Sequence, residues 1–224
     1  VIATAGIGLT EVDSFTNYLE ANIRALKYEI QKAREKTKGI LGINILGVLS
    51  NYSDMVKTAI QEKIDVIFTG AGLPLTLPQF LKKSDNTALV PIISSARAAK
   101  IIAEKWFHNF SYVPDAFVVE GPLAGGHLGF KREQIQDKTF SLENIVADIV
   151  NEVKLLETKF NKKIPVIAAG GIYSGADILK YFKLGASGVQ MATRFVATHE
   201  CDASNEFKAT YLNAEEKDIT IISS

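Results

Sequence analysis

The chain has 224 residues, and 47% of them are hydrophobic, which is enough to bury a substantial core. Lysine and arginine together number 25, as do aspartate and glutamate, so the sequence has no basic field that would attract nucleic acid. It also has no run of about 18 apolar residues, as a membrane span requires, and no signal-peptide pattern at its start. We therefore expect a cytoplasmic protein that binds a small molecule rather than a nucleic acid or a membrane, while its oligomeric state stays open.

Seven short apolar runs, separated by segments with a helical pattern, predict a parallel α/β fold. The runs do not alternate polar with apolar residues, which is typical of strands buried on both faces of a sheet. The predicted strands are 1–5, 40–45, 66–69, 90–94, 116–120, 166–169 and 188–191. The predicted helices are 15–36, 55–62 and 96–106, one that Ser141 caps, and one that runs from Ser174 to a stop at Gly185.

The number of strand-helix units favours a (β/α)8 TIM barrel. Seven units are one short of the eight that close such a barrel, and the sequence begins inside a strand pattern without an initiator methionine. We expect the first strand and a C-terminal extension to be absent from this chain. No Gly/Ser/Pro-rich linker divides residues 1–224, which predicts a single domain. An open doubly wound sheet is the alternative, but glycine-rich turns follow many strands instead of only the first.

Two loops near the C-terminal end have the character of a phosphate site. In a TIM barrel the loops after the last two strands commonly hold phosphate. Gly170 and Gly171 follow one strand, and their missing side chains would let backbone N–H groups approach an anion. After the next strand, we expect Gln190, Ala192 and Thr193 to complete the same site. A glycine pair after a strand can also be a simple turn, so the pairing of the two loops is what favours phosphate.

A second glycine-rich loop, residues 120–130, surrounds His127. An imidazole titrates near neutral pH and can act as an acid, a base or a neutral donor. His127 is therefore our catalytic candidate, with a solvent-exposed loop histidine as the alternative. His108 and His199 have no comparable setting, and we expect both at the surface.

Two polar residues belong to predicted strands. Asn44 lies inside an apolar run, where a lone amide must find a partner or incur a burial cost. Glu120 ends its strand at the same rim as His127 and could bond a polar ligand, although a solvated charge is equally typical of that position. The sequence has no Rossmann, Walker or Gly-x-Ser-x-Gly motif, and it has no cysteine-histidine set with the spacing of metal ligands. We therefore expect no metal site.

Three motifs in this order resemble the nitronate monooxygenase family, formerly called 2-nitropropane dioxygenases. The matching segments are AGGHLG at 124–129, AAGGI at 168–172 and GASGVQMATRF at 185–195. The resemblance implies a TIM barrel with non-covalently bound FMN and with His127 as the active-site histidine beside the flavin. It further implies flavin contacts from Asn44, Glu120, Ala124, Gly125 and Gly126, and phosphate contacts from Gly170, Gly171, Ala192 and Thr193.

The implied activity is the oxidation of alkyl nitronates or nitroalkanes by dioxygen to carbonyl compounds and nitrite. Many nitronate oxidisers have a lysine near the flavin where this chain has Ile92, which weakens the substrate assignment. The related flavin-dependent enoyl-acyl-carrier-protein reductases, which take electrons from NAD(P)H, have an apolar residue there and are the main alternative. A barrel that binds a phosphorylated ligand without catalysis is a third interpretation.

Overall fold

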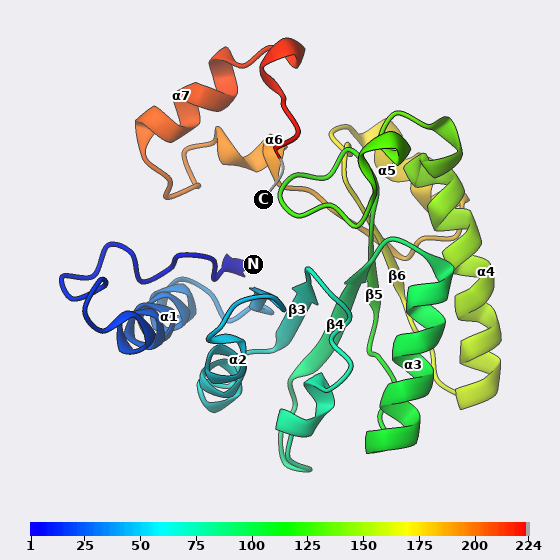
Figure 1. The fold of residues 1–224 in the computed structure, drawn as a ribbon, viewed down its shortest axis with the longest axis horizontal. Coiled ribbons are helices and arrows are strands. Elements are labelled where there is room, and N and C mark those ends of the chain that lie inside the picture. The colour runs from blue at the N-terminus through cyan, green and yellow to red at the C-terminus, as the bar shows by residue number, and fades with distance from the viewer. Residues whose placement is uncertain (223–224) are drawn as a thin grey trace.

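The protein is described by a computed structural model that covers residues 1–222, so the last two residues of the predicted 1–224 domain lie outside the described part. Strands and helices alternate along the chain (Figure 1). The strands are β1 (Ile2–Ala3), β2 (Gly42–Leu46), β3 (Val66–Gly70), β4 (Ala88–Ile93), β5 (Phe117–Glu120), β6 (Val166–Ala169) and β7 (Gly188–Gln190). The α-helices are α1 (Tyr18–Lys36), α2 (Tyr52–Gln61), α3 (Ala96–Phe110), α4 (Leu142–Phe160), α5 (Gly175–Lys183), α6 (Thr193–Val196) and α7 (Asn205–Asn213).

The seven strands form one parallel sheet in the order of the sequence, from β1 to β7. The sheet is curled and forms part of a (β/α)8 barrel, which confirms the predicted fold class. Within residues 1–222, β1 and β7 are edge strands that do not pair with each other. The two sides of this opening are linked on the outside, where Lys32 of α1 lies 3.3 Å from the carboxylate of Asp202, before α7.

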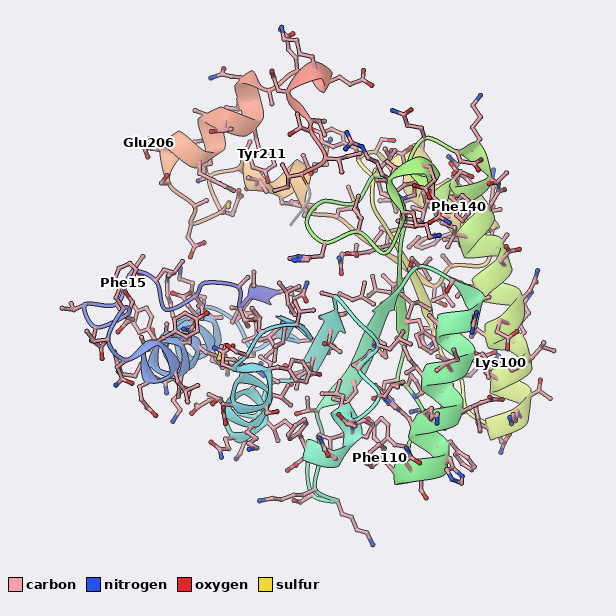
Figure 2. All side chains as sticks on the ribbon, viewed as in Figure 1. Phe15, Lys100, Phe110, Phe140, Glu206 and Tyr211 are labelled. Atoms are coloured by element: carbon pink, nitrogen blue, oxygen red, sulfur yellow. The ribbon has the colours of Figure 1, made fainter. Side chains whose placement is uncertain are left out.

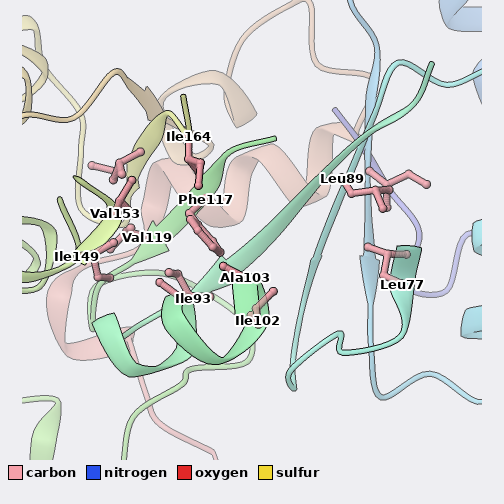
Figure 3. Packing of buried hydrophobic residues seen from close by; sticks show 14 of the residues in the cluster. Leu77, Leu89, Ile93, Ile102, Ala103, Phe117, Val119, Ile149, Val153 and Ile164 are labelled. Carbon is pink, nitrogen blue, oxygen red and sulfur yellow. The ribbon is translucent and has the colours of Figure 1, made fainter. Parts of the chain in front are cut away.

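Alternate residues of each strand face two different cores. On the outer side, residues such as Phe117 and Val119 of β5 pack against α3 and α4, as Figure 3 shows with Ile102 and Ile149. On the inner side a smaller cluster contains Val90, Ala116, Val118 and Ala169, with Val66, Phe68, Ile92 and Ile167 against it. Both faces of the sheet are therefore apolar along most of their length, which is why the strands read as continuous apolar runs.

The structure differs most from the predicted elements at the two ends of the chain, although α2 begins at Tyr52 instead of residue 55 and α3 ends at Phe110 instead of residue 106. The first strand covers only Ile2–Ala3, and α1 begins at Tyr18 instead of residue 15. The preceding residues form turns that fold back on α1, where the Asn22 side chain accepts a hydrogen bond from the Gly8 N–H at 3.3 Å. Phe15 consequently projects from a turn and is 93% exposed (Figure 2). The helices α6 and α7 were not predicted from the sequence.

The predicted helix starts at Ser141 and Ser174 and the predicted helix stop at Gly185 are confirmed. The Ser141 hydroxyl accepts a hydrogen bond from Asn144 N at the start of α4. Ser174 forms a reciprocal capping box with Asp177 at the start of α5, and Gly185, with φ of +98°, follows its end. Within residues 1–222, no helix has the length and apolar character needed to cross a membrane.

Candidate functional site

The strand register places three predicted ligand residues on the inner face of the sheet. Asn44 is aligned with Phe68, which packs against the inner cluster. Glu120 is aligned with Ala169, and Ala169 with Gln190, so these two polar side chains lie two strands apart at the same rim. Because all three point to the side that α3 and α4 do not cover, one ligand on this face could contact them together.

Asn44 has a side-chain oxygen without a partner. The backbone carbonyl of Asn44 accepts hydrogen bonds from the N–H of Thr4 at 3.2 Å and from its hydroxyl at 2.9 Å. The side-chain Oδ1 is buried and accepts none from residues 1–222. A buried acceptor without a donor costs about 1–3 kcal/mol. A ligand N–H or O–H on the inner face would remove that cost, as we expect from the sequence.

A second such oxygen belongs to Asn51, the residue that precedes α2. Asn51 is only 6% exposed, and its Oδ1 also has no hydrogen-bond donor within residues 1–222. Asn51 is not among the site residues predicted from the sequence, and an asparagine before a helix is typical of an ordinary N-cap. In the structure its side chain makes no capping hydrogen bond.

Glu120 is partly buried, and burial alone raises the pKa of its carboxyl group. Its side chain makes no hydrogen bond or ion pair with residues 1–222 that would offset this desolvation. Glu120 therefore holds a proton more readily than a solvated glutamate does, and its protonated form can donate a hydrogen bond to a ligand.

The glycine-rich loop after β5, which we call the histidine loop (residues 121–130), is fastened to its neighbours. The Ser94 hydroxyl, just after β4, donates a hydrogen bond to the carbonyl of Gly129 at 3.2 Å, and Ala124 N donates to Gly121 O at 3.1 Å. In Figure 1 this green loop extends away from α3 and α4, toward the opening of the sheet. His127 is exposed, as are the predicted surface residues His108 and His199.

Two glycines in the middle of the histidine loop, Gly125 and Gly126, border open space. A side-chain Cβ placed on Gly125 or Gly126 would have no atom within 4 Å, and Gly126 has a left-handed φ of +83°. The protein itself therefore does not need a glycine at Gly125 for packing. An open backbone surface of this kind can receive a flat ligand.

The loop after β6 lies against the histidine loop. A Cβ on Gly170 would be 2.9 Å from the backbone N of Ala124, and one on Gly171 would be 3.0 Å from the Leu123 side chain. Both glycines also have positive φ, +99° and +71°. These contacts join two loops that are 40 residues or more apart in the sequence. They also give the glycine pair a packing role that the sequence analysis did not consider.

The backbone N–H groups at the start of α5 are already hydrogen-bonded to a carboxylate of the same helix. The Asp177 carboxylate accepts hydrogen bonds from Tyr173 N at 3.2 Å, Ser174 N at 2.8 Å and the Ser174 hydroxyl at 2.7 Å, and these bonds lower the pKa of Asp177. These N–H groups are therefore not free for an anion. By contrast, the N–H groups of Gly171 and Ile172 make no hydrogen bond within the described chain.

The loop after β7 reaches the same place. Ala192 precedes α6 and Thr193 begins it, and neither of their N–H groups has an acceptor within residues 1–222. The next residue, Arg194, places its guanidinium 4.8 Å from the centre of the Tyr173 ring, in the loop after β6. The structure thus brings together the two loops that we expect to share a phosphate. The pairing of Arg194 with Tyr173 carries no sequence signal, because it depends on how the loops pack.

A surface cavity of about 280 Å³ lies elsewhere, at the amino ends of β6 and β7. Val153, Lys154, Glu157 and Pro165 are among the residues that line it. The candidate site is instead an open surface at the carboxyl ends of the strands, where barrel enzymes have their active sites. Within residues 1–222 no group of three or more histidine, cysteine or acidic side chains is arranged to hold a metal ion.

Comparison with known proteins identifies the family. The model of the family described as nitronate monooxygenase matches residues 9–224. The chain belongs to the nitronate monooxygenase family. A probable nitronate monooxygenase of Staphylococcus aureus is 31% identical over 74% of this chain and 42% of its own length. A (3aS,4S,5R,7aS)-5-hydroxy-7a-methyl-1-oxo-octahydro-1H-indene-4-carboxyl-CoA dehydrogenase of Rhodococcus jostii is 30% identical over 86% of this chain and 48% of its own length.

Two solved structures share the fold of this member of the nitronate monooxygenase family. FabK from Thermotoga maritima is 31% identical and superposes with a TM-score of 0.68, over 86% of this chain and 53% of that chain. Nitroalkane oxidase from Streptomyces ansochromogenes superposes with a TM-score of 0.65 at 20% identity, over 84% of this chain and 59% of that chain. The chain spans about half the length of the curated relatives that it matches, 42% and 48% for the two above.

Proposed function

We propose that this chain forms the FMN-binding part of an oxidoreductase that uses dioxygen to convert alkyl nitronates to carbonyl compounds and nitrite. The observation that carries the proposal is the contact of the histidine loop with the glycine pair of the next loop, Gly170 against Ala124. Together with the contact of Arg194 with Tyr173, it brings the loop of His127 to the loops after β6 and β7, whose backbone N–H groups at Gly171, Ile172, Ala192 and Thr193 have no acceptor within residues 1–222. Family membership and a probable nitronate monooxygenase among the relatives support the same reaction.

The described residues fit an FMN molecule in three respects. The buried Oδ1 of Asn44 needs a donor, and a flavin ring N–H or ribityl hydroxyl is one. The open backbone at Gly125 and Gly126 leaves room for a flat ring system. The unpaired N–H groups of Gly171, Ile172 and Thr193 suit a terminal phosphate. We therefore assign Gln190, Ala192 and Glu120, at the same rim, to this cofactor site as well.

The redox chemistry, the transfer of electrons from the substrate to dioxygen, is what FMN supplies when it is bound. The protein's own contribution is binding and proton handling. His127 is exposed, so its imidazole is free to remove a proton from a neutral nitroalkane or to stabilise the nitronate anion. Glu120, whose pKa is raised by burial, can donate a hydrogen bond to the bound ligand when protonated.

A second candidate function has its own support. Ile92 lies on the inner face, where it packs close to Gly70 and against the inner cluster, so this part of the site is apolar. The structural relationship to FabK, an enoyl-acyl-carrier-protein reductase, and the CoA dehydrogenase among the relatives point to a thioester substrate. In that reaction NAD(P)H would be the source of electrons.

The test is to record the flavin spectrum of the purified protein and then supply each reductant separately. Nitrite release from an alkyl nitronate in air, without NAD(P)H, is the result expected for the proposed function. Bleaching of the flavin by NAD(P)H together with turnover of an enoyl thioester would replace it with the second function. Flavin binding without either turnover would leave a ligand-binding barrel and contradict both.

A further inference from the structure

Arg194 and Tyr173 connect the two loops of the candidate phosphate site. Tyr173 follows Gly171 and Ile172, and Arg194 follows Ala192 and Thr193. The guanidinium lies 4.8 Å from the centre of the aromatic ring, which is the geometry of a cation–π pair. Both side chains are exposed. The aromatic ring of one loop therefore contacts the cation of the other, and both loops have backbone N–H groups without an acceptor within residues 1–222.

The charge of Arg194 is not used elsewhere in the described chain. Within residues 1–222, no carboxylate lies within ion-pair distance of its guanidinium. The other nearby cation, Lys180 of α5, is paired with Glu143 of α4. Arg194 is thus available to a ligand, whereas Lys180 is already neutralised.

The same place also contains a negative charge that an anion would have to face. Asp177 is ionised at neutral pH, because the Ser174 hydroxyl and the N–H groups of Ser174 and Tyr173 lower its pKa. Its carboxylate is held against the backbone of the loop that also carries Gly171. A phosphate beside this loop therefore needs a cation as well as backbone donors, since like charges at short range repel each other.

We propose that Arg194, held in place by the Tyr173 ring, is the cationic contact of the flavin phosphate and makes the site select FMN over riboflavin. The inference rests on FMN as the ligand of the proposed function. Arginine suits this role because its planar guanidinium can give two hydrogen bonds to a phosphate while one face stays stacked on an aromatic ring. Tyr173 acts as a positioning residue, and Arg194 as a binding residue.

The experiment measures the affinities of the apoprotein for FMN and for riboflavin by quenching of flavin fluorescence. Arg194→Gln should weaken FMN binding by about 10-fold or more and change riboflavin binding by less than about 2-fold, since only FMN carries the phosphate. Arg194→Lys, which keeps the charge without the paired donors, should give an intermediate loss. Lys100→Gln removes one positive charge from the outer face of α3 and should leave both affinities unchanged (Figure 2).

Variants of Tyr173 test how the arginine is positioned. Tyr173→Phe keeps the aromatic face and should retain FMN affinity, whereas Tyr173→Leu should weaken FMN binding in the same selective way as Arg194→Gln. Wild-type affinity for FMN should also fall as salt is raised, and that dependence should be smaller in Arg194→Gln.

Equal loss of FMN and riboflavin affinity in Arg194→Gln would show that the residue only holds the loops together, and unchanged FMN affinity would remove it from the site. Either result overturns the inference while leaving the proposed reaction intact. Normal, Arg194-dependent FMN binding without nitrite release would instead contradict the proposed reaction alone. Thermal melting of each apoprotein separates a lost contact from a misfolded variant.

Discussion

Asn44 and Glu120 are polar side chains whose burial the described protein does not compensate. Within residues 1–222, the Oδ1 of Asn44 has no donor, and the carboxyl group of Glu120 has no partner that would offset its desolvation. Both lie on the inner face of a sheet whose other inward side chains form an apolar cluster. Uncompensated polar groups of this kind are typical of ligand sites, because the bound molecule supplies the missing partner.

The pKa shift of Glu120 predicts a pH-dependent gain in stability for Glu120→Gln. The folded pKa is raised above the unfolded value, so the contribution of the protonated carboxyl is complete below about pH 4.3 and is lost as the pH rises through the folded pKa. At pH 7 the apoprotein of the variant should therefore be more stable than wild type, and this difference should shrink toward pH 4. Urea unfolding at several pH values measures it. A gain that does not depend on pH would contradict the assigned cause.

For His127 we expect a loss of turnover without a loss of cofactor. His127 is exposed and makes no hydrogen bond with residues 1–222, so His127→Ala should leave the fold intact. Nitronate or nitroalkane turnover should fall by roughly 100-fold, the scale of a positioned acid-base group. Nitrite release and the flavin spectrum are measured on the same sample, with His108→Ala as the matched control on an exposed histidine of α3. Wild-type turnover in His127→Ala would exclude its catalytic role.

At the scale of elements, the loops after β5, β6 and β7 form one contiguous structure. Gly170 is packed against Ala124, and the Tyr173 ring is packed against Arg194. Each loop therefore depends on the next for its position. A substitution in the loop after β6 should therefore alter the positions of the loops after β5 and β7.

Two glycine variants separate packing from ligand binding. Gly170→Ala places a Cβ 2.9 Å from Ala124 N at a φ of +99°, so we expect the free energy of unfolding to fall by about 1–3 kcal/mol, together with FMN affinity. Gly125→Ala projects into open space and should leave stability unchanged while weakening FMN binding. Denaturant unfolding of the apoprotein and flavin titration give both quantities. Weaker stability in Gly125→Ala, or full affinity in both variants, would contradict the assignment.

The strands and helix caps are predictable from the sequence because their signals are local. The apolar run 166–169 and the cap at Ser174 can be identified from a few neighbouring residues. The contact of Gly170 with Ala124 cannot be identified in this way, since it joins residues from separate strand-helix units. The start of α1 at Tyr18 instead of residue 15 cannot be identified in this way either, because it depends on the packing of Gly8 on Asn22.

The sequence allowed candidate site residues to be selected, but it did not show how they are arranged in space. An asparagine in an apolar run and a histidine among glycines are unusual enough to be selected from the sequence. The carboxylate of Asp177 shows what the sequence leaves out, because it already accepts hydrogen bonds from the N–H groups at the start of α5. The expectation of FMN as the cofactor came from the family resemblance and from no single motif.

On the scale of the whole molecule, the two ends of the sheet have different roles, one in ligand binding and the other in stability. The candidate site occupies the carboxyl ends of the strands, whereas a polar cluster fixes the amino ends. There Asp115 accepts hydrogen bonds from Leu89 N at 2.8 Å, from the Tyr112 hydroxyl and from Lys162 Nζ at 2.7 Å. These bonds tie together β4, the segment before β5 and the segment before β6. In barrel folds the amino end commonly serves stability.

Asp115→Ala should accordingly destabilise the protein without weakening flavin binding. The substitution leaves the N–H of Leu89 and the ammonium of Lys162 without their carboxylate, which should lower the free energy of unfolding by about 1–3 kcal/mol. Denaturant unfolding measures the loss, and FMN titration below the unfolding transition should match wild type. Weakened FMN binding in a fully folded Asp115→Ala sample would show that the two ends are coupled.

The hydrogen bond from Ser94 to Gly129 has a thermodynamic consequence for ligand binding. Together with the contact at Gly170, it fixes the histidine loop at two points before a ligand arrives. Holding a residue in one backbone conformation costs about 1–2 kcal/mol of conformational entropy, and the folding of the chain has already met that cost here. Ligand binding therefore costs less conformational entropy in this loop, so that a larger part of the favourable contact energy contributes to the affinity.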